Sequence, residues 1–245
     1  MGFMIEGLSA PRASNMLILE SSENRVHLLE LFSTESCSSC PPADQWMGSL
    51  RRSPGLWKSF VPVVAHVHYW DYLGWKDPFS SPENTARQKA YVATWKGGYA
   101  YTPNFVLDGA DWRGQRLRDL SESSQKVGVL KATQTGTSSY QIEFHPSSGI
   151  AKSYQVHGSL LGNGIEVDVR RGENAGKKLK HHFLTLDHQT NSMSPSAKGS
   201  FFAKLNFNAT RDARAESMSI AFWVSEAGNP RPLQAVGADL ERGSK

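Results

Sequence analysis

The sequence CSSCPP at residues 37–42 is the stretch on which the fold prediction depends, and it holds both cysteines of the 245-residue chain. Residues 25–32 before it are mostly apolar and predict a central strand. Residues 42–52 after it have apolar side chains at helical spacing. Two prolines fit the first turn of a helix, where the backbone N–H groups have no helical partner. The cysteine pair is therefore predicted between the end of a strand and the start of a helix.

A Cys-x-x-Cys pair in this position is typical of thioredoxin-type redox sites. The unpaired N–H groups and the partial positive charge at a helix N-terminus stabilise a thiolate. The thiol pKa in such motifs falls from about 8.5 to roughly 3.5–7.5. We assign nucleophilic attack to Cys37, which is expected nearer to solvent, and resolution of the mixed disulfide to Cys40 within the helix. A structural disulfide and a pair of inert thiols are the alternatives that the motif leaves open.

The rest of the first half predicts alternating strands and helices. An apolar run at residues 60–67 predicts a buried strand, and residues 81–95 predict a helix that ends at a Gly-Gly pair. A further strand is predicted at residues 104–107, with an antiparallel partner near 111–113, and a third helix at 117–130. The first half is therefore predicted to be an α/β domain.

The composition shifts near residues 133–139, and short alternating runs separated by turn-rich segments follow. Their spacing predicts an all-β sandwich-like domain. We therefore expect a disordered or lead-in segment at 1–24, a thioredoxin-like α/β domain at 25–132 and the β-sandwich-like domain at 133–245. The predicted strands of the last part are residues 140–144, 154–161, 165–170, 179–186, 201–207, 217–223 and 234–238.

Four motifs follow one another along the chain: ELFSTESCSSCPPAD at 30–44, HVHYWDYLGWKDPF at 66–79, YTPNFVLDG at 101–109 and RGENAG at 171–176. In these motifs the chain resembles the DUF1223 family, bacterial proteins of unknown function with a thioredoxin-like fold. The resemblance extends from about residue 25 onward, and it implies the fold more than the function. His68 stands where the family pattern usually has aspartate.

The resemblance also implies a periplasmic or secreted location, because members of the family commonly begin with a secretory signal. Residues 16–19 (MLIL) are shorter than the roughly 7–15 apolar residues of a signal peptide, so no clear signal is predicted. The sequence has no run of about 18 apolar residues, so no transmembrane segment is predicted. The net charge is +4, and no cluster of basic residues dominates the sequence. Nucleic acid is therefore not an expected partner.

The Thr102-Pro103 dipeptide is the second expected part of the redox site. The resemblance implies a cis-proline beside the cysteines, with the preceding residue facing the disulfide. The cis form costs least in an X–Pro bond. Thr102 and Pro103 are therefore expected to position a protein thiol or disulfide. A proline that opens a strand is the plainer alternative.

His66 and His68 support a rival hypothesis. At a spacing of two on a strand, both side chains point to the same face. Together with Cys37 and Cys40 they would form a plausible set of zinc or copper ligands. The redox interpretation requires no cofactor, whereas this alternative requires copper or zinc. In the plainer interpretation one histidine packs in the core and the other caps a loop.

Tyr69, Trp70 and Asp71 are candidates for substrate binding beside the cysteines, although aromatic residues in a loop most often serve packing. Residues 177–182 (KKLKHH) form a basic patch that we expect at a solvated strand edge. Residues 171–176 have the composition of a turn, and the alternative is that they place Glu173 and Asn174 at the interface between the two expected domains.

The leading hypothesis is a thiol–disulfide oxidoreductase that acts on a protein thiol or disulfide together with an unidentified redox partner. The alternatives are a copper or zinc delivery protein and a non-enzymatic protein-interaction module with a structural disulfide. Replacement of Cys37 would abolish exchange under the first hypothesis, whereas replacement of His68 would matter chiefly under the second.

Overall fold

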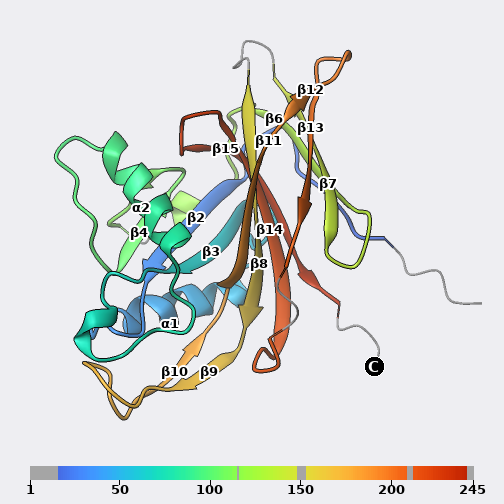
Figure 1. Ribbon diagram of the computed structural model, residues 1–245. Coiled ribbons are helices and arrows are strands. Elements are labelled where there is room, and N and C mark those ends of the chain that lie inside the picture. Colours follow the sequence, from blue (N-terminus) through green and yellow to red (C-terminus); the bar gives the residue numbers. More distant parts are fainter. Residues whose placement is uncertain (1–15, 115, 148–152, 209–211, 242–245) are drawn as a thin grey trace, which may run out of the picture.

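The computed structural model describes residues 16–114, 116–147, 153–208 and 212–241 (Figure 1). Within these ranges the chain forms fifteen β-strands and two α-helices, α1 (Pro41–Ser49) and α2 (Pro82–Thr94). Neither helix is long and apolar enough to cross a membrane, and the same holds for every other helix in the described ranges.

Eight strands form one mixed sheet in the order β15-β14-β8-β11-β3-β2-β4-β5. Strands β2 and β11 both run parallel to β3, and the other neighbours are antiparallel. In chain order these strands are β2 (His27–Ser33), β3 (Phe60–His66), β4 (Asn104–Leu107), β5 (Ala110–Asp111), β8 (Tyr154–Asn163), β11 (Leu184–Ser192), β14 (Ser217–Glu226) and β15 (Pro232–Leu240).

This sheet shows that the predicted fold class is wrong. We expected an α/β thioredoxin-like domain followed by an all-β sandwich-like domain, but strands from both halves pair directly, with Leu184 opposite Val64. The described chain is mostly β-structure. The segment predicted as a third helix contains a short 3-10 turn (Leu117–Leu120) and the start of strand β6 (Gly128–Gln134). Hydrophobic patterning identifies strands, but it does not specify which distant strands become neighbours, and the prediction failed for this reason.

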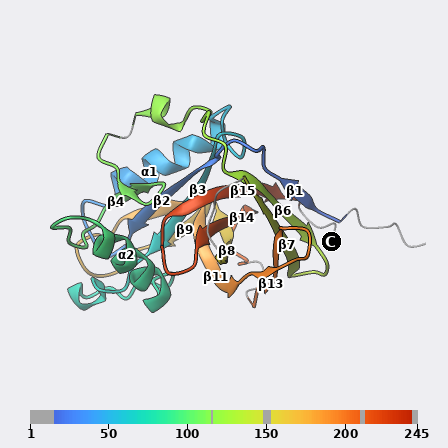
Figure 2. The same ribbon diagram turned by 90° about the horizontal axis from the view of Figure 1, so that it is seen from above.

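A second sheet, in the order β1-β6-β7-β13-β12, packs against one face of the large sheet (Figure 2). Its aromatic side chains meet those of the large sheet, and the ring centroids of Tyr140 and Phe222 are 5.1 Å apart. Gly158 permits the close approach, because a Cβ atom there would lie 2.9 Å from a Leu205 methyl group. Its other strands are β1 (Ile18–Glu20), β7 (Ser139–Pro146), β12 (Ser194–Pro195) and β13 (Phe201–Asn206).

The first 24 residues were predicted as a lead-in. Residues 1–15 lie outside the described residues, and residues 18–20 form strand β1, which pairs with β6. The large sheet itself crosses the predicted boundary between residues 132 and 133. The strands β9 (Ile165–Asp168) and β10 (Lys178–His181) form a separate antiparallel ribbon.

The centre of the large sheet positions the candidate site. Helices α1 and α2 lie on opposite sides of β2 and β3 (Figure 2), and every residue of β3 is buried, as expected for a continuous apolar strand covered on both faces. The parallel register places Ser33 beside His66 at the carboxyl ends of β2 and β3. Helix α1 packs on these strands and also contacts β10. The ends of β2, β3 and β10 and the first turn of α1 therefore meet in one place.

Candidate functional site

Cys37 and Cys40 lie between β2 and α1, as the sequence predicted. Cys40 occupies the N-cap of α1, and Pro41 and Pro42 form its first residues, where the missing N–H groups cost no helical hydrogen bond. Both thiols are free. Cys37 is 8% exposed, whereas Cys40 is fully buried. Cys37 is therefore the cysteine of the pair that a macromolecule can reach.

The surroundings of Cys37 lower its pKa from 9.0 to about 5. The largest cause is a hydrogen bond with the Cys40 thiol, which stabilises the thiolate. The Ser39 hydroxyl, with its Oγ 3.1 Å from Cys37 Sγ, acts in the same direction. The Thr102 side chain also lowers the pKa, while partial burial opposes all three. The Cys37 thiol in addition donates a long hydrogen bond of 3.9 Å to the Thr102 carbonyl oxygen. At neutral pH Cys37 is therefore mainly a thiolate.

Cys40 differs from Cys37 in its acidity. Burial raises the pKa of Cys40 well above its ordinary value, and the neighbouring Cys37 thiolate raises it further. The carboxylate of Asp44, one helical turn along α1, acts in the same direction. The pair thus combines an acidic thiol near the surface with a buried thiol that keeps its proton.

A loop from the second half of the chain fixes the backbone around the cysteines. Asn174 is fully buried, and its side-chain amide donates hydrogen bonds to the carbonyl oxygens of Glu35 and Cys37 at 2.8 and 2.9 Å. Glu173 accepts a hydrogen bond of 2.8 Å from the backbone N–H of Ser38. The sequence marked residues 171–176 as a turn, but it did not show that this turn supports the cysteine motif.

The Thr102-Pro103 peptide bond is cis, as predicted. The carbonyl oxygen of Thr102, the residue before Pro103, lies 3.9 Å from Cys37 Sγ, so this peptide bond is next to the cysteine. Pro103 also lines an open pocket of about 230 Å³. Its other lining residues are Tyr99, Tyr101, Phe105, Trp112 and Arg113. Sequence reasoning missed this pocket, although aromatic residues on both sides of the proline were a visible signal.

The predicted substrate residues Tyr69, Trp70 and Asp71 lie elsewhere and do not line this pocket. Burial raises the pKa of Tyr69, and negative charge on the nearby sulfur atoms of Cys40 and Cys37 raises it further. The Tyr69 hydroxyl donates a hydrogen bond to the side chain of Gln88. Trp70 packs between the rings of Tyr69 and Tyr72. Asp71 accepts hydrogen bonds within its own loop. A role of these three residues in substrate binding stays a prediction.

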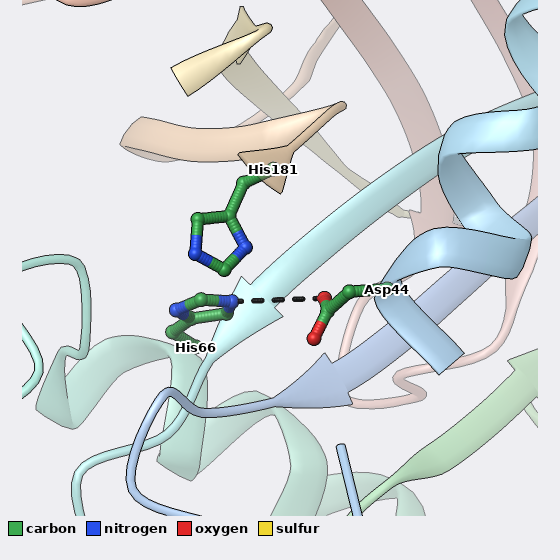
Figure 3. A group of neighbouring side chains, drawn as sticks. All are labelled: Asp44, His66 and His181. Carbon is green, nitrogen blue, oxygen red and sulfur yellow. Dashed lines mark ion pairs between the residues drawn. The ribbon is translucent and has the colours of Figure 1, made fainter. Parts of the chain in front are cut away.

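His66 and His68 are not brought together. His66 is buried, and its Nδ1 lies 2.8 Å from a carboxylate oxygen of Asp77. His68 is exposed, and its Nδ1 lies 2.8 Å from the hydroxyl of Thr85. In the described ranges, the side chains of metal-binding type that converge are Asp44, His66 and His181, a group without either cysteine (Figure 3).

His181 was predicted in a basic patch at a solvated strand edge, and for this residue the prediction is wrong. The alternation of strand β10 turns Lys178 and Lys180 outward and Leu179 and His181 inward. His181 is 1% exposed, and its Nε2 lies 3.2 Å from a carboxylate oxygen of Glu35. The alternation of polar and less polar residues in KLKH (178–181) was a sequence signal that could have assigned Lys178 and Lys180 to the exposed face and His181 to the buried face.

Comparison with protein families now adds to this geometry. The model of the family described as "Protein of unknown function (DUF1223)" matches residues 28–225. The chain belongs to this family. The match covers both the cysteine motif and the Asn174 loop of this chain. No curated protein matches the sequence.

Two solved structures share the fold of this DUF1223 protein. Protein AGR_C_4864 from Agrobacterium tumefaciens has a TM-score of 0.63 at 21% identity, with 92% of this chain and 98% of that chain covered. HBP35 of Porphyromonas gingivalis has a TM-score of 0.59 at 16% identity, with 90% of this chain and 76% of that chain covered. At such identities the likeness concerns the fold alone.

Proposed function

We propose that this DUF1223 protein is a thiol–disulfide oxidoreductase. The observation that carries the proposal is the asymmetry of its cysteine pair. Cys37 has a pKa of about 5 and is slightly exposed, whereas Cys40 is buried and its pKa is raised. The thiolate is the nucleophile in disulfide exchange, so the two cysteines suit the roles of attacking and resolving thiol.

The exchange requires two displacements. The Cys37 thiolate attacks one sulfur of a substrate disulfide, the substrate S–S bond breaks, and the leaving thiolate takes a proton from solvent. Cys40 then loses its proton and attacks Cys37 Sγ, which forms the Cys37–Cys40 disulfide and releases the second substrate thiol. Two electrons pass from the pair to the substrate, and the reverse sequence oxidises a dithiol.

The acidity of Cys37 favours the oxidising direction. A low thiol pKa stabilises the reduced form of the pair and makes Cys37 a good leaving group. A pKa of about 5 in place of 9.0 stabilises the reduced form at pH 7 by about 2.7 kcal/mol, which corresponds to roughly 60 mV. We therefore propose that the disulfide form accepts electrons from protein dithiols.

The aromatic pocket beside Pro103 supports a protein substrate. Its rings and the largely exposed Arg113 side chain suit an apolar or aromatic residue next to a substrate cysteine. Pro103 lines the pocket, and the carbonyl oxygen of the preceding Thr102 contacts Cys37 Sγ, so the pocket lies next to the reactive sulfur. The pocket is thus a candidate for the recognition of an extended peptide.

The test is a redox titration of the metal-free protein in glutathione buffers, followed by alkylation and mass measurement. We expect a reversible two-electron transition, loss of exchange in Cys37→Ser and a trapped mixed disulfide in Cys40→Ser. A pair that does not cycle, or a Cys37→Ser variant that still exchanges disulfides, would show that the proposal is wrong.

A further inference from the structure

The buried group behind the cysteines has unusual geometry for a plain hydrogen-bond network. Asp44 comes from α1, His66 from the end of β3 and His181 from the end of β10, and none is more than 6% exposed (Figure 3). One ligand atom of each lies within 4.8 Å of the other two. Yet His66 Nε2 is 3.9 Å from the Asp44 carboxylate, which is beyond hydrogen-bond distance.

Three of the four ring nitrogens in this group lack a hydrogen bond. His181 Nδ1 and both ring nitrogens of His66 are buried without a hydrogen bond. Leaving a buried donor or acceptor unsatisfied costs about 1–3 kcal/mol. A protonated His66 would pair with its two carboxylates, but it would leave His181 Nδ1 unsatisfied. The three ligand atoms therefore face one another as if around a common partner.

The opposite side of each of these side chains lies against another polar or charged group. His66 Nδ1 lies 2.8 Å from Asp77, and His181 Nε2 lies 3.2 Å from Glu35. The second oxygen of Asp44 accepts a hydrogen bond of 2.8 Å from Ser33. A histidine that binds a metal almost always donates its other ring N–H to a carboxylate, a carbonyl or water, and this contact fixes the tautomer and the ring orientation. Both histidines here have that carboxylate.

We propose that Asp44, His66 and His181 bind a divalent transition-metal ion, with zinc as the expected one. Two imidazoles and one carboxylate are a known zinc donor set. Zinc bonds of roughly 2.0–2.2 Å place neighbouring ligand atoms about 3.3–3.6 Å apart, so separations of up to 4.8 Å need to contract by at most about 1.5 Å. The ion also offsets the charge of the three buried carboxylates, Asp44, Asp77 and Glu35.

This site differs from the cysteine-based set considered from the sequence. It shares His66 with that set, but it excludes Cys37, Cys40 and His68. Because its ligands are buried, the ion is expected to bind during folding and to stabilise the fold. The proposal stands independently of disulfide exchange.

The first test measures the metal content of the full chain, refolded with one equivalent of zinc chloride and dialysed, by inductively coupled plasma mass spectrometry. We expect about one zinc per wild-type chain and loss of stoichiometric zinc in Asp44→Asn and His181→Gln. Glu35→Gln should bind zinc about 10–100-fold more weakly. The matched control His68→Gln and the double variant Cys37→Ser/Cys40→Ser should keep the ion.

A second measurement uses only the wild-type protein, so it stays informative if the variants fail to fold. The thermal midpoint of the wild-type protein should rise with zinc and fall again with a chelator. If neither metal content nor midpoint responds to zinc, manganese or iron(II), the group is an ion-pair network and the proposal is wrong. Loss of zinc in the cysteine double variant, with retention in His181→Gln, would overturn it in favour of a cysteine site. Stoichiometric iron or manganese at the same residues would overturn the choice of zinc.

Discussion

Replacement of Cys40 with alanine should raise the pKa of Cys37 from about 5 toward 9.0, because the Cys40 thiol is the largest cause of the lowered value. The full difference of four units (9 minus 5) corresponds to about 5 kcal/mol. The side chains of Ser39 and Thr102 still lower the pKa of Cys37 in this variant, so part of the lowering remains. If the pKa of Cys37 rises from about 5 to about 7, the thiolate fraction at pH 6 falls from roughly 90% to roughly 9%, about a tenfold loss of reactivity.

The assay measures the rate of alkylation by iodoacetamide between about pH 4 and pH 9, a range that includes the lowered pKa of Cys37 and extends to its ordinary value. The Cys40→Ala variant has a single thiol, so its profile belongs to Cys37 alone. Cys40→Ser keeps a hydroxyl donor and should fall between the wild-type protein and Cys40→Ala. Ser38→Ala is the matched control, because the Ser38 side chain is exposed and does not contact the sulfur in the described structure.

Two results would refute the proposed effect of Cys40 on the pKa of Cys37: alkylation of reduced wild-type protein with a midpoint near pH 9, or the same profile for Cys40→Ala and wild type. The first result would also remove the main support for Cys37 as the nucleophile. Identical profiles would show that the Cys40 thiol does not cause the lowered pKa of Cys37.

Three further predictions concern stability, recognition and pH. Asn174→Ala removes the hydrogen bond to the Glu35 carbonyl and one of the two to the Cys37 carbonyl, which keeps the bond from the Cys40 N–H. It should lower the free energy of unfolding by about 1–3 kcal/mol in urea denaturation, and a change below about 0.5 kcal/mol would contradict this role. Trp112→Ala should raise the KM for a reduced peptide substrate about tenfold without shifting the pKa of Cys37, and an unchanged KM would exclude the pocket from recognition. The folded pKa of Cys37 lies below its unfolded value, so its stabilisation is fully present above about pH 9 and is lost as pH falls through about 5. Reduced wild type should therefore lose about 2 kcal/mol more than Cys37→Ser between pH 7 and pH 5, and equal losses in the two proteins would contradict the lowered pKa.

Much of the local structure could be predicted from the sequence. The strand–cysteine–helix order around residues 37–42 is confirmed, because apolar periodicity and proline position are local signals. The short alternating runs of the second half are strands, although residues 179–186 divide into β10 and β11. Phe183, at φ 55°, lies between these two strands.

The partners of these strands could not be predicted. Nothing in the alternation of residues 184–192 specifies pairing with β3, which lies more than a hundred residues earlier. The same limit applies to the site, because Asn174 and His181 reach the cysteine region only through the tertiary fold. Cys37 and Thr102 were predicted together through a family resemblance, and their contact is found in the structure.

The parallel pairing of β11 with β3 has a consequence for biosynthesis. Chains emerge from the ribosome N-terminal end first, and the loop-closure entropy of a distant pairing is lost before its contacts form. The cysteine motif leaves the ribosome long before β11 and Asn174, which complete its surroundings. The nascent chain therefore presents Cys37 before the Asn174 hydrogen bonds to its backbone can form, although Cys40, Ser39 and Thr102, which lower the pKa of Cys37, have already been translated.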